Sequence, residues 1–429
     1  MRSRPNAWTR HFAICAFAAT LAMPLLAQNN VVLMKLGLQS LFGGKESFVA
    51  VLQKKLNQLP APCGPLTKLA ENGRLDASLR NAIMRAATCG KNAALLAGDA
   101  SAREGDLTVL FWKRILPEVP LPTVTQRAMI LVLTLEATDY DDLEWIFCQN
   151  KPHYDPAVGQ NSCYTNDAKS YITWGPRGAT AGHGAEVQQI VAAVDSNSAK
   201  RNLIDADFGS VAWDIRRMLR LSYADTEKFL CAAWIDPVQR AKWNDGFRKF
   251  GVEPDVVAAY NAVYDSRQFD GGKIETWLRL YRTAGVAPTE VDYAFFLDRA
   301  TQASAPGAVT IAAAAKAMSL LGDGRGSAQL RRWIALNARP SHQVGDRLGR
   351  DVVFYIDALE TSLTPEELAA WKHRNPIRAS EAGLDDRRPS GDYHATPLAT
   401  GAPPRGTEQL TSAERAVCPA AVLHPLPPK

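Results

Sequence analysis

The sequence predicts a mainly α fold of the α+β class, with more than one folded unit in 429 residues. Apolar residues recur at helical spacing in several stretches, among them residues 47–59 and 75–87 and much of 183–340. Strand signals are few and gather near residues 170–182. We therefore expect helices to form the cores and one small β-hairpin to interrupt them.

The first 27 residues have the layout of a secretory signal peptide. An Arg-rich start is followed by an apolar run and by a small residue, Ala27. An uncleaved membrane anchor is the alternative, although the apolar run is short for a membrane span. No second apolar stretch approaches the ~18 residues of a membrane helix. The sequence therefore predicts a secreted or periplasmic protein without a membrane span after cleavage.

The cysteines indicate disulfides. Removal of the signal peptide leaves an even number of them in a chain bound for an oxidising compartment. Their spacing does not match a metal site, so we expect no metal. Cys63–Cys89 and Cys148–Cys163 would each close a local loop, which leaves Cys231 to pair with Cys418. Because Lys and Arg are spread along the chain and the net charge is only +5, nothing indicates nucleic acid as a partner.

Residues 28–115 are predicted to form a small helical module and its linker. Two helical patterns flank the turn-rich stretch PAPCGPLTKLAENGR. The stretch resembles bacterial peptidoglycan-binding modules, and a helical pair of unknown ligand is the alternative. The residues that carry the resemblance are Leu52, Gln53, Leu56, Asn57, Leu59, Asn72, Gly73, Leu75, Leu79, Ala82 and Ile83.

A proline-rich boundary at residues 116–125 precedes an apolar helix that ends at Glu136. A carboxylate at the end of such a helix, followed by a polar bend, has an apolar floor on one side and a cleft on the other. This setting suits a general acid. A solvated Glu at a helix end is the alternative.

The chain ends with a short helix and a polar tail. Within residues 346–375, Thr364 is a predicted N-cap, Pro365 lies in the first turn and Glu367 occupies the capping-box position. Residues 376–429 are rich in Pro, Gly, Ser, Asp and Arg, and we expect this tail to be largely disordered. Cys418 could nevertheless tie its end back to the body.

Within a predicted domain of residues 116–345, the stretch from about 120 to 305 resembles the chitosanases of glycoside hydrolase family 46, in the wider lysozyme superfamily. LEATDYDDLEW and YITWGPRGATAG match a catalytic Glu at a helix end and a β-hairpin, and three later segments between 234 and 300 match in the same order. The matching residues are Glu136, Asp142, Leu143, Trp145, Arg177, Gly178, Thr180, Ala181 and Gly182.

The resemblance implies a lysozyme-like catalytic domain in which Glu136 is the general acid and Thr180 positions the attacking water. It also implies that one buried Asp and two Arg form a network behind the Glu, for which Asp236, Arg282 and Arg299 fall at plausible positions.

Other residues of the hairpin are also candidates for roles in the site. Arg177 could hold a carboxylate through two hydrogen bonds. Trp174 could stack on a sugar or belong to the core, and His183 could line the cleft or cap a helix.

One residue departs from the family. Gly175 stands where the family has the aspartate that acts as general base. Candidate substitutes are Glu186, Asp167, Asp139 and Asp142. We favour Glu186, which starts the helix after the hairpin, although a Glu there could simply stabilise the helix dipole. Other members of the superfamily use one Glu and the acetamido group of the substrate.

These observations predict a glycoside hydrolase that cleaves β-1,4 bonds of an amino-sugar polymer, most directly peptidoglycan, without a cofactor. A chitosanase is the first alternative, because the resemblance of the catalytic domain taken alone favours it. A cell-wall-binding protein without turnover is the second, because of Gly175. A secreted helical protein of another kind remains the third.

Overall fold

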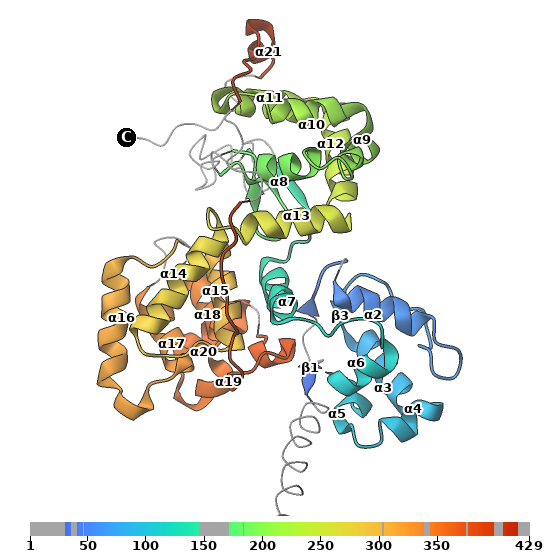
Figure 1. The fold of residues 1–429 in the computed structure, drawn as a ribbon, viewed down its shortest axis with the longest axis vertical. Helices are drawn as coiled ribbons and strands as arrows, with labels where there is room; N and C mark the ends of the chain where they lie inside the picture. Colours follow the sequence, from blue (N-terminus) through green and yellow to red (C-terminus); the bar gives the residue numbers. More distant parts are fainter. Residues whose placement is uncertain are drawn as a thin grey trace, which may run out of the picture.

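The computed structural model describes residues 31–35, 41–45, 47–145, 171–182, 184–302, 304–338, 344–374, 376–398 and 406–418. Within these ranges the chain is mainly helical, with three small antiparallel sheets (Figure 1). The predicted mainly α fold is confirmed. No helix in these ranges is long and apolar enough to cross a membrane. The predicted signal peptide, the Cys148–Cys163 pair, Asp167 and His183 lie outside the described residues.

Residues 31–115 form two short sheets and a group of helices at the lower right of Figure 1. The side chains of Ser47 and Asp76 accept hydrogen bonds from backbone N–H groups of the first turns that follow, which explains where α2 and α3 begin. The predicted Cys63–Cys89 disulfide is present and ties the connection between these helices to the end of α3. The elements are β1 (Val32–Met34) paired with β4 (Leu107–Thr108), β2 (Leu41–Phe42) paired with β3 (Arg74–Leu75), α2 (Phe48–Asn57), α3 (Ala77–Thr88), α4 (Gly90–Leu95), α5 (Ala100–Arg103) and α6 (Val109–Ile115).

Two polar residues of the peptidoglycan-binding pattern hold the turn between α2 and α3. Gln53 accepts a hydrogen bond from the N–H of Gly73 and donates to the carbonyl of Arg74, both at 2.9 Å. Asn57 exchanges two hydrogen bonds with the backbone of Leu69. These motif positions therefore have a structural role in this chain.

Helix α7 (Val124–Glu136) lies at the centre of the molecule (Figure 1). It begins at a capping box between Thr123 and Gln126 and ends where Ala137 adopts the left-handed conformation, with φ of 58°. Most of its residues are buried, and α15 packs along it. The end of α7 at Glu136 is therefore fixed by local geometry and by packing.

The chain then forms a three-stranded sheet and the helices at the top of Figure 1. The strand order is β5–β6–β7, and Thr173 of β6 faces Thr180 of β7. The predicted β element near residues 170–182 is thus present. The elements are β5 (Leu143–Trp145), β6 (Ile172–Trp174), β7 (Ala179–Thr180), α8 (Glu186–Asp195), α9 (Asn202–Phe208), α10 (Ala212–Met218), α11 (Tyr223–Ile235), α12 (Pro237–Phe250) and α13 (Pro254–Tyr264).

The remaining helices form the left part of Figure 1. The last of them, α20, begins as predicted: Glu367 accepts a hydrogen bond from the N–H of Thr364, and Thr364 accepts one from the N–H of Glu367. These helices are α14 (Asp270–Thr283), α15 (Glu290–Gln302), α16 (Ala308–Leu320), α17 (Ser327–Asn337), α18 (Val344–Val352), α19 (Ile356–Leu359) and α20 (Pro365–Arg374).

The hydrophobic cores do not follow the predicted boundaries. One core joins side chains from residues 33–135 with others from 274–384, and a second contains residues 140–264 and Cys418. Residues 28–115 are therefore not a separate module on a linker. Two hydrogen bonds join the N-terminal residues directly to later segments. The N–H of Phe42 donates to the hydroxyl of Thr134 on α7, and the N–H of Lys35 donates to the carbonyl of Glu381.

The expected disorder of the C-terminal tail is wrong for residues 376–398 and 406–418. Ile377 and Leu384 are buried in the first core, and the N–H of Arg267 donates to the carbonyl of Thr396. The predicted Cys231–Cys418 disulfide then joins α11 to the residues after α21 (Ser412–Ala416). A few apolar contacts and one crosslink thus order a segment whose composition alone predicts disorder.

Candidate functional site

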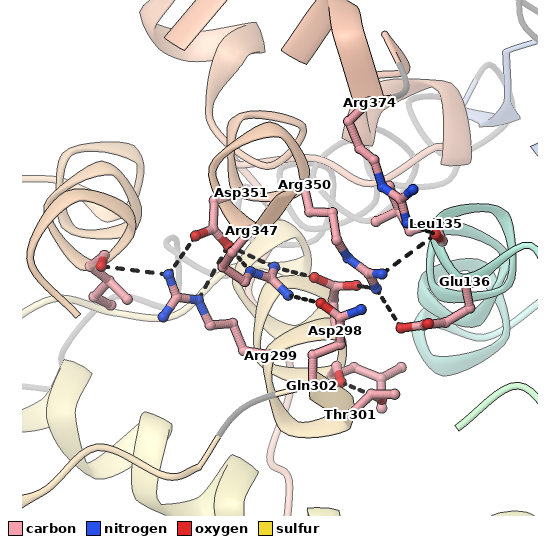
Figure 2. Close-up of polar contacts among 12 residues, drawn as sticks. Leu135, Glu136, Asp298, Arg299, Thr301, Gln302, Arg347, Arg350, Asp351 and Arg374 are labelled. Atoms are coloured by element: carbon pink, nitrogen blue, oxygen red, sulfur yellow. Dashed lines mark hydrogen bonds and ion pairs between the residues drawn. The ribbon is translucent and has the colours of Figure 1, made fainter. Parts of the chain in front are cut away.

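Glu136 is held by a buried arginine. Its side chain is 20% exposed, and its Oε1 lies 2.7 Å from a guanidinium nitrogen of Arg350, which is fully buried. Figure 2 shows the carboxyl group of Glu136 projecting from the end of α7 toward Arg350. The same arginine and Arg374 also donate to the carbonyl of Leu135, so cations occupy the negative end of the helix dipole. The orientation of Glu136 is thus fixed while part of the side chain stays accessible.

A chain of buried charges lies behind this pair (Figure 2). Asp298 of α15 bonds to both Arg350 and Arg347 of α18. Arg347 also bonds to Asp351, at 2.7 Å, and Asp351 pairs with Arg299. A buried charge is costly unless it is paired, and here each guanidinium meets at least one carboxylate. Asp298 therefore fixes Arg350, and Arg350 fixes Glu136.

The charges of this cluster set the ionisation of Asp298. Burial by itself would raise the pKa of this carboxyl group, but the neighbouring charges of Arg347 and Arg350 outweigh it and lower the pKa to about 2. Burial disfavours the charged form of Arg350, yet Asp298 and Glu136 raise its pKa above the usual value. Asp298 and Arg350 thus stay charged near neutral pH.

The structure corrects two of the three residues that we expected behind Glu136. Asp236 is exposed and caps α12 by accepting hydrogen bonds from Val238 and Gln239. Arg282 lines a different pocket, beside α14. Arg299 does belong to the charge cluster, but it reaches Glu136 only through Asp351, Arg347, Asp298 and Arg350. Sequence distance explains the error, because Arg350 lies 214 residues after Glu136.

The sequence reasoning missed Asp298, Arg347 and Arg350. A signal for Asp298 was present, since this acid follows the apolar run YAFFL, and a charge in a buried helix requires a partner. No comparable signal marked Arg347 and Arg350, because GDRLGRD has the composition of a solvated helix.

A second carboxylate is fixed by the hairpin. Oε2 of Glu186 accepts hydrogen bonds from the N–H and the hydroxyl of Thr180, at 3.1 and 2.7 Å. The carboxyl group lies so close to Gly184 that a Cβ there would come within 1.8 Å of Oε1. Among the described residues no donor contacts Oε1, which leaves this oxygen able to accept a hydrogen bond from water. Thr180 and Glu186 thus form the pair that we expected to handle water.

Glu136 bonds to different residues from those that contact Thr180 and Glu186. No hydrogen bond or ion pair between described residues joins Glu136 to Thr180, Glu186 or Arg177. The side chain of Arg177 is buried and pairs with Asp265 and Asp270, each at 3.0 Å. It holds carboxylates, as predicted, but those of the protein itself.

Trp174 is a core residue. Its side chain is fully buried, its indole N–H donates to the carbonyl of Tyr140, and its ring packs against Phe247 and Tyr260. Of the two roles considered for Trp174, the role in the core is confirmed and the role in stacking on a sugar is wrong.

The packing of Tyr260 against residue 175 explains why this residue is a glycine. Gly175 has φ of +74°, and a Cβ there would lie 2.7 Å from the ring of Tyr260. Tyr260 is itself fixed, because its hydroxyl accepts a hydrogen bond from the N–H of Arg177 and donates one to the carbonyl of Trp174. A family-like aspartate therefore does not fit this turn.

We expect Gly175→Asp to destabilise the protein by about 2 kcal/mol through left-handed strain and overpacking. Thermal unfolding, followed by circular dichroism, measures the loss. In a Tyr260→Ala background the same substitution should cost less, because the ring that it meets is gone. Equal losses in both backgrounds would contradict the packing argument.

The polar loop after Glu136 carries the other candidate carboxylates. Asp142 accepts a hydrogen bond from the N–H of Asp139 at 2.7 Å, and its carbonyl accepts one from Gly175. Burial raises the pKa of Asp139. With Asp141, these two line a pocket of about 360 Å³ that also includes residues of the N-terminal part. The expected alternative bases therefore lie together, next to the end of α7.

Comparisons with known proteins identify no relative: no protein-family model, no curated protein and no solved structure matches the chain. Among the residues that the structure describes, no group of three or more His, Cys, Asp or Glu side chains could hold a metal ion.

Proposed function

We propose that the protein is a secreted or periplasmic glycoside hydrolase that cleaves β-1,4 bonds of an amino-sugar polymer, with peptidoglycan as the substrate. The observation that carries the proposal is the ion pair between Glu136 and Arg350. A partly exposed carboxyl group at a helix end is oriented by a buried guanidinium, which Asp298 in turn fixes. The pair supports the proposal through orientation, because proton transfer to a leaving group requires a carboxyl group whose direction is fixed.

The charge cluster behind Glu136 can be compared with the network that the chitosanase resemblance implies. The resemblance implies one buried Asp and two Arg behind the catalytic Glu, and Asp298, Arg347 and Arg350 have that relation to Glu136. Asp236 and Arg282, two of the three residues that the resemblance indicated, do not belong to this network. The network acts by positioning, since it fixes the direction in which Glu136 offers its proton.

In the proposed reaction, Glu136 gives its proton to the glycosidic oxygen as the bond from that oxygen to the anomeric carbon breaks. Water attacks the anomeric carbon from the opposite face and passes its proton to Glu186. Thr180 holds Glu186 by two hydrogen bonds, and the second carboxylate oxygen remains for the water. Glu186 thereby takes the role of the base that Gly175 does not supply.

Two alternatives have specific support. Asp139, Asp141 and Asp142 line one pocket and are the feature that favours a cationic polymer such as chitosan, while Lys45, which pairs with Asp141, and Arg74 line the same pocket. The turn at Gly175 excludes the family base and favours a cell-wall-binding protein without turnover. Peptidoglycan remains our first choice because residues 28–115 resemble peptidoglycan-binding modules.

A substrate panel tests the proposal. Purified sacculi and chitosan are digested with the wild type and with Glu136→Gln, and soluble products are identified by mass spectrometry. We expect muropeptides from sacculi with the wild type only. Reducing ends released from chitosan but not from sacculi would favour the chitosanase. Binding to sacculi without products from either substrate across pH 4–8 would refute the hydrolase.

A further inference from the structure

A basic pocket lies beside α14, in the part of the fold where the C-terminal tail crosses it. Its volume is about 610 Å³, within the range of sites that hold molecules larger than a single ion. Side chains from α14, from the loop before it and from tail residues Tyr393 and His394 line the pocket. The charged residues among them are Arg267, Lys273, Arg279, Arg282 and Glu275.

The single carboxylate of this lining is already engaged. Glu275 accepts a hydrogen bond from the N–H of Ala395 at 3.0 Å, and its other oxygen lies 3.4 Å from Arg267. Lys273 is engaged as well, because its ammonium group donates to Asp270 and to the carbonyl of Ala300. Glu275 is thus not free to neutralise the remaining arginines, and the charge of Lys273 is compensated by Asp270.

Arg279 and Arg282 are the uncompensated charges. Both are exposed, and neither guanidinium group makes a hydrogen bond or an ion pair with any described residue. They lie three residues apart on α14 and therefore on one side of the helix, the side that carries Glu275. Two guanidinium forks consequently share one pocket with no protein carboxylate to bind.

We propose that this pocket binds the phosphate groups of an anionic ligand, in the form of a linear phosphodiester polymer. A guanidinium fork matches the oxygens of a phosphate group bidentately. One carboxylate would occupy one fork, whereas a phosphodiester chain offers repeated anionic groups to Arg279, Arg282 and Arg267. The volume of the pocket accommodates more than one such group. This site is distinct from Glu136 and does not depend on hydrolysis.

Titration calorimetry with oligomers of poly(glycerol phosphate) tests the proposal in the full chain. The matched variants are Arg279→Gln/Arg282→Gln and, as a control, Arg103→Gln/Arg201→Gln, which removes two exposed arginines that do not line the pocket. We expect the first pair to weaken binding at least about tenfold, because both charged hydrogen-bonding groups that face the phosphates are lost. The control should stay within about twofold of the wild type, and affinity should fall with salt.

Titrations with other anions show whether the pocket recognises a phosphate polymer, a single phosphate group or any anion. Inorganic phosphate should bind the same site more weakly, since it offers one group only, and tighter binding of inorganic phosphate would identify a small phosphate as the ligand. Poly-γ-glutamate, which carries only carboxylates, should bind at least about tenfold more weakly than the phosphate polymer. Three results would overturn the proposal: no binding of any phosphate ligand, equal losses in both variant pairs, or equal affinity for poly-γ-glutamate.

Discussion

Glu136→Gln is expected to lower the rate of glycan hydrolysis by about 100- to 10,000-fold, the contribution that a positioned general acid makes. The amide retains the shape of the side chain but cannot give a proton to the glycosidic oxygen. Arg350 keeps its partner Asp298 and the carbonyl of Leu135, so the fold should survive the change. The measurement is the initial rate of reducing-end release from the polymer that the wild type cleaves.

A substrate with a different leaving group tests whether Glu136 acts by donating a proton. An aryl glycoside with a strongly acidic phenol leaves without protonation, so Glu136→Gln should lose much less activity on it than on the glycan. Glu118→Gln serves as the control, because Glu118 is exposed and makes no hydrogen bond or ion pair with the described residues around Glu136. Equal losses on both substrates would assign Glu136 to binding or to structure instead of acid catalysis.

Local signals in the sequence predicted the part of the site that local structure builds. The capping residue Thr123 and the apolar run after it place the end of α7 at Glu136, and the glycine-rich stretch places Thr180 beside Glu186. The pairings Cys63–Cys89 and Cys231–Cys418 followed from loop closure and elimination. In each case the decisive contact is either close in sequence or covalent.

Contacts between distant segments could not be predicted in this way. Arg347 and Arg350 lie at helical spacing in a polar segment, a pattern that fits a solvated face as well as a buried cluster. Only the packing of α18 and α15 distinguishes the two, because it buries the arginines against Asp298. Tyr260 likewise explains Gly175, although 85 residues separate them.

Asp298→Asn is expected to have the largest effect on stability, a loss of about 3 to 5 kcal/mol in the free energy of unfolding. The amide has nearly the same size as the carboxyl group but no charge, so Arg347 and Arg350 would remain buried with one anion fewer. Urea unfolding at pH 7, followed by fluorescence, measures the loss. Asp323→Asn is the control, because Asp323 is exposed in a short turn, and it should change stability by less than about 0.5 kcal/mol.

The pH dependence of this loss separates the lost charge from a packing defect. The pKa of Asp298 is about 2 in the folded protein, below the ~3.9 of an unperturbed aspartate. A lowered pKa means that the carboxylate stabilises the fold fully above about pH 4 and loses this contribution as the pH falls toward 2. The stability difference between wild type and Asp298→Asn should therefore be constant between pH 5 and 7 and shrink below pH 4. A difference that stays constant down to pH 2.5 would show that packing, and not the pairing with Arg347 and Arg350, accounts for the loss.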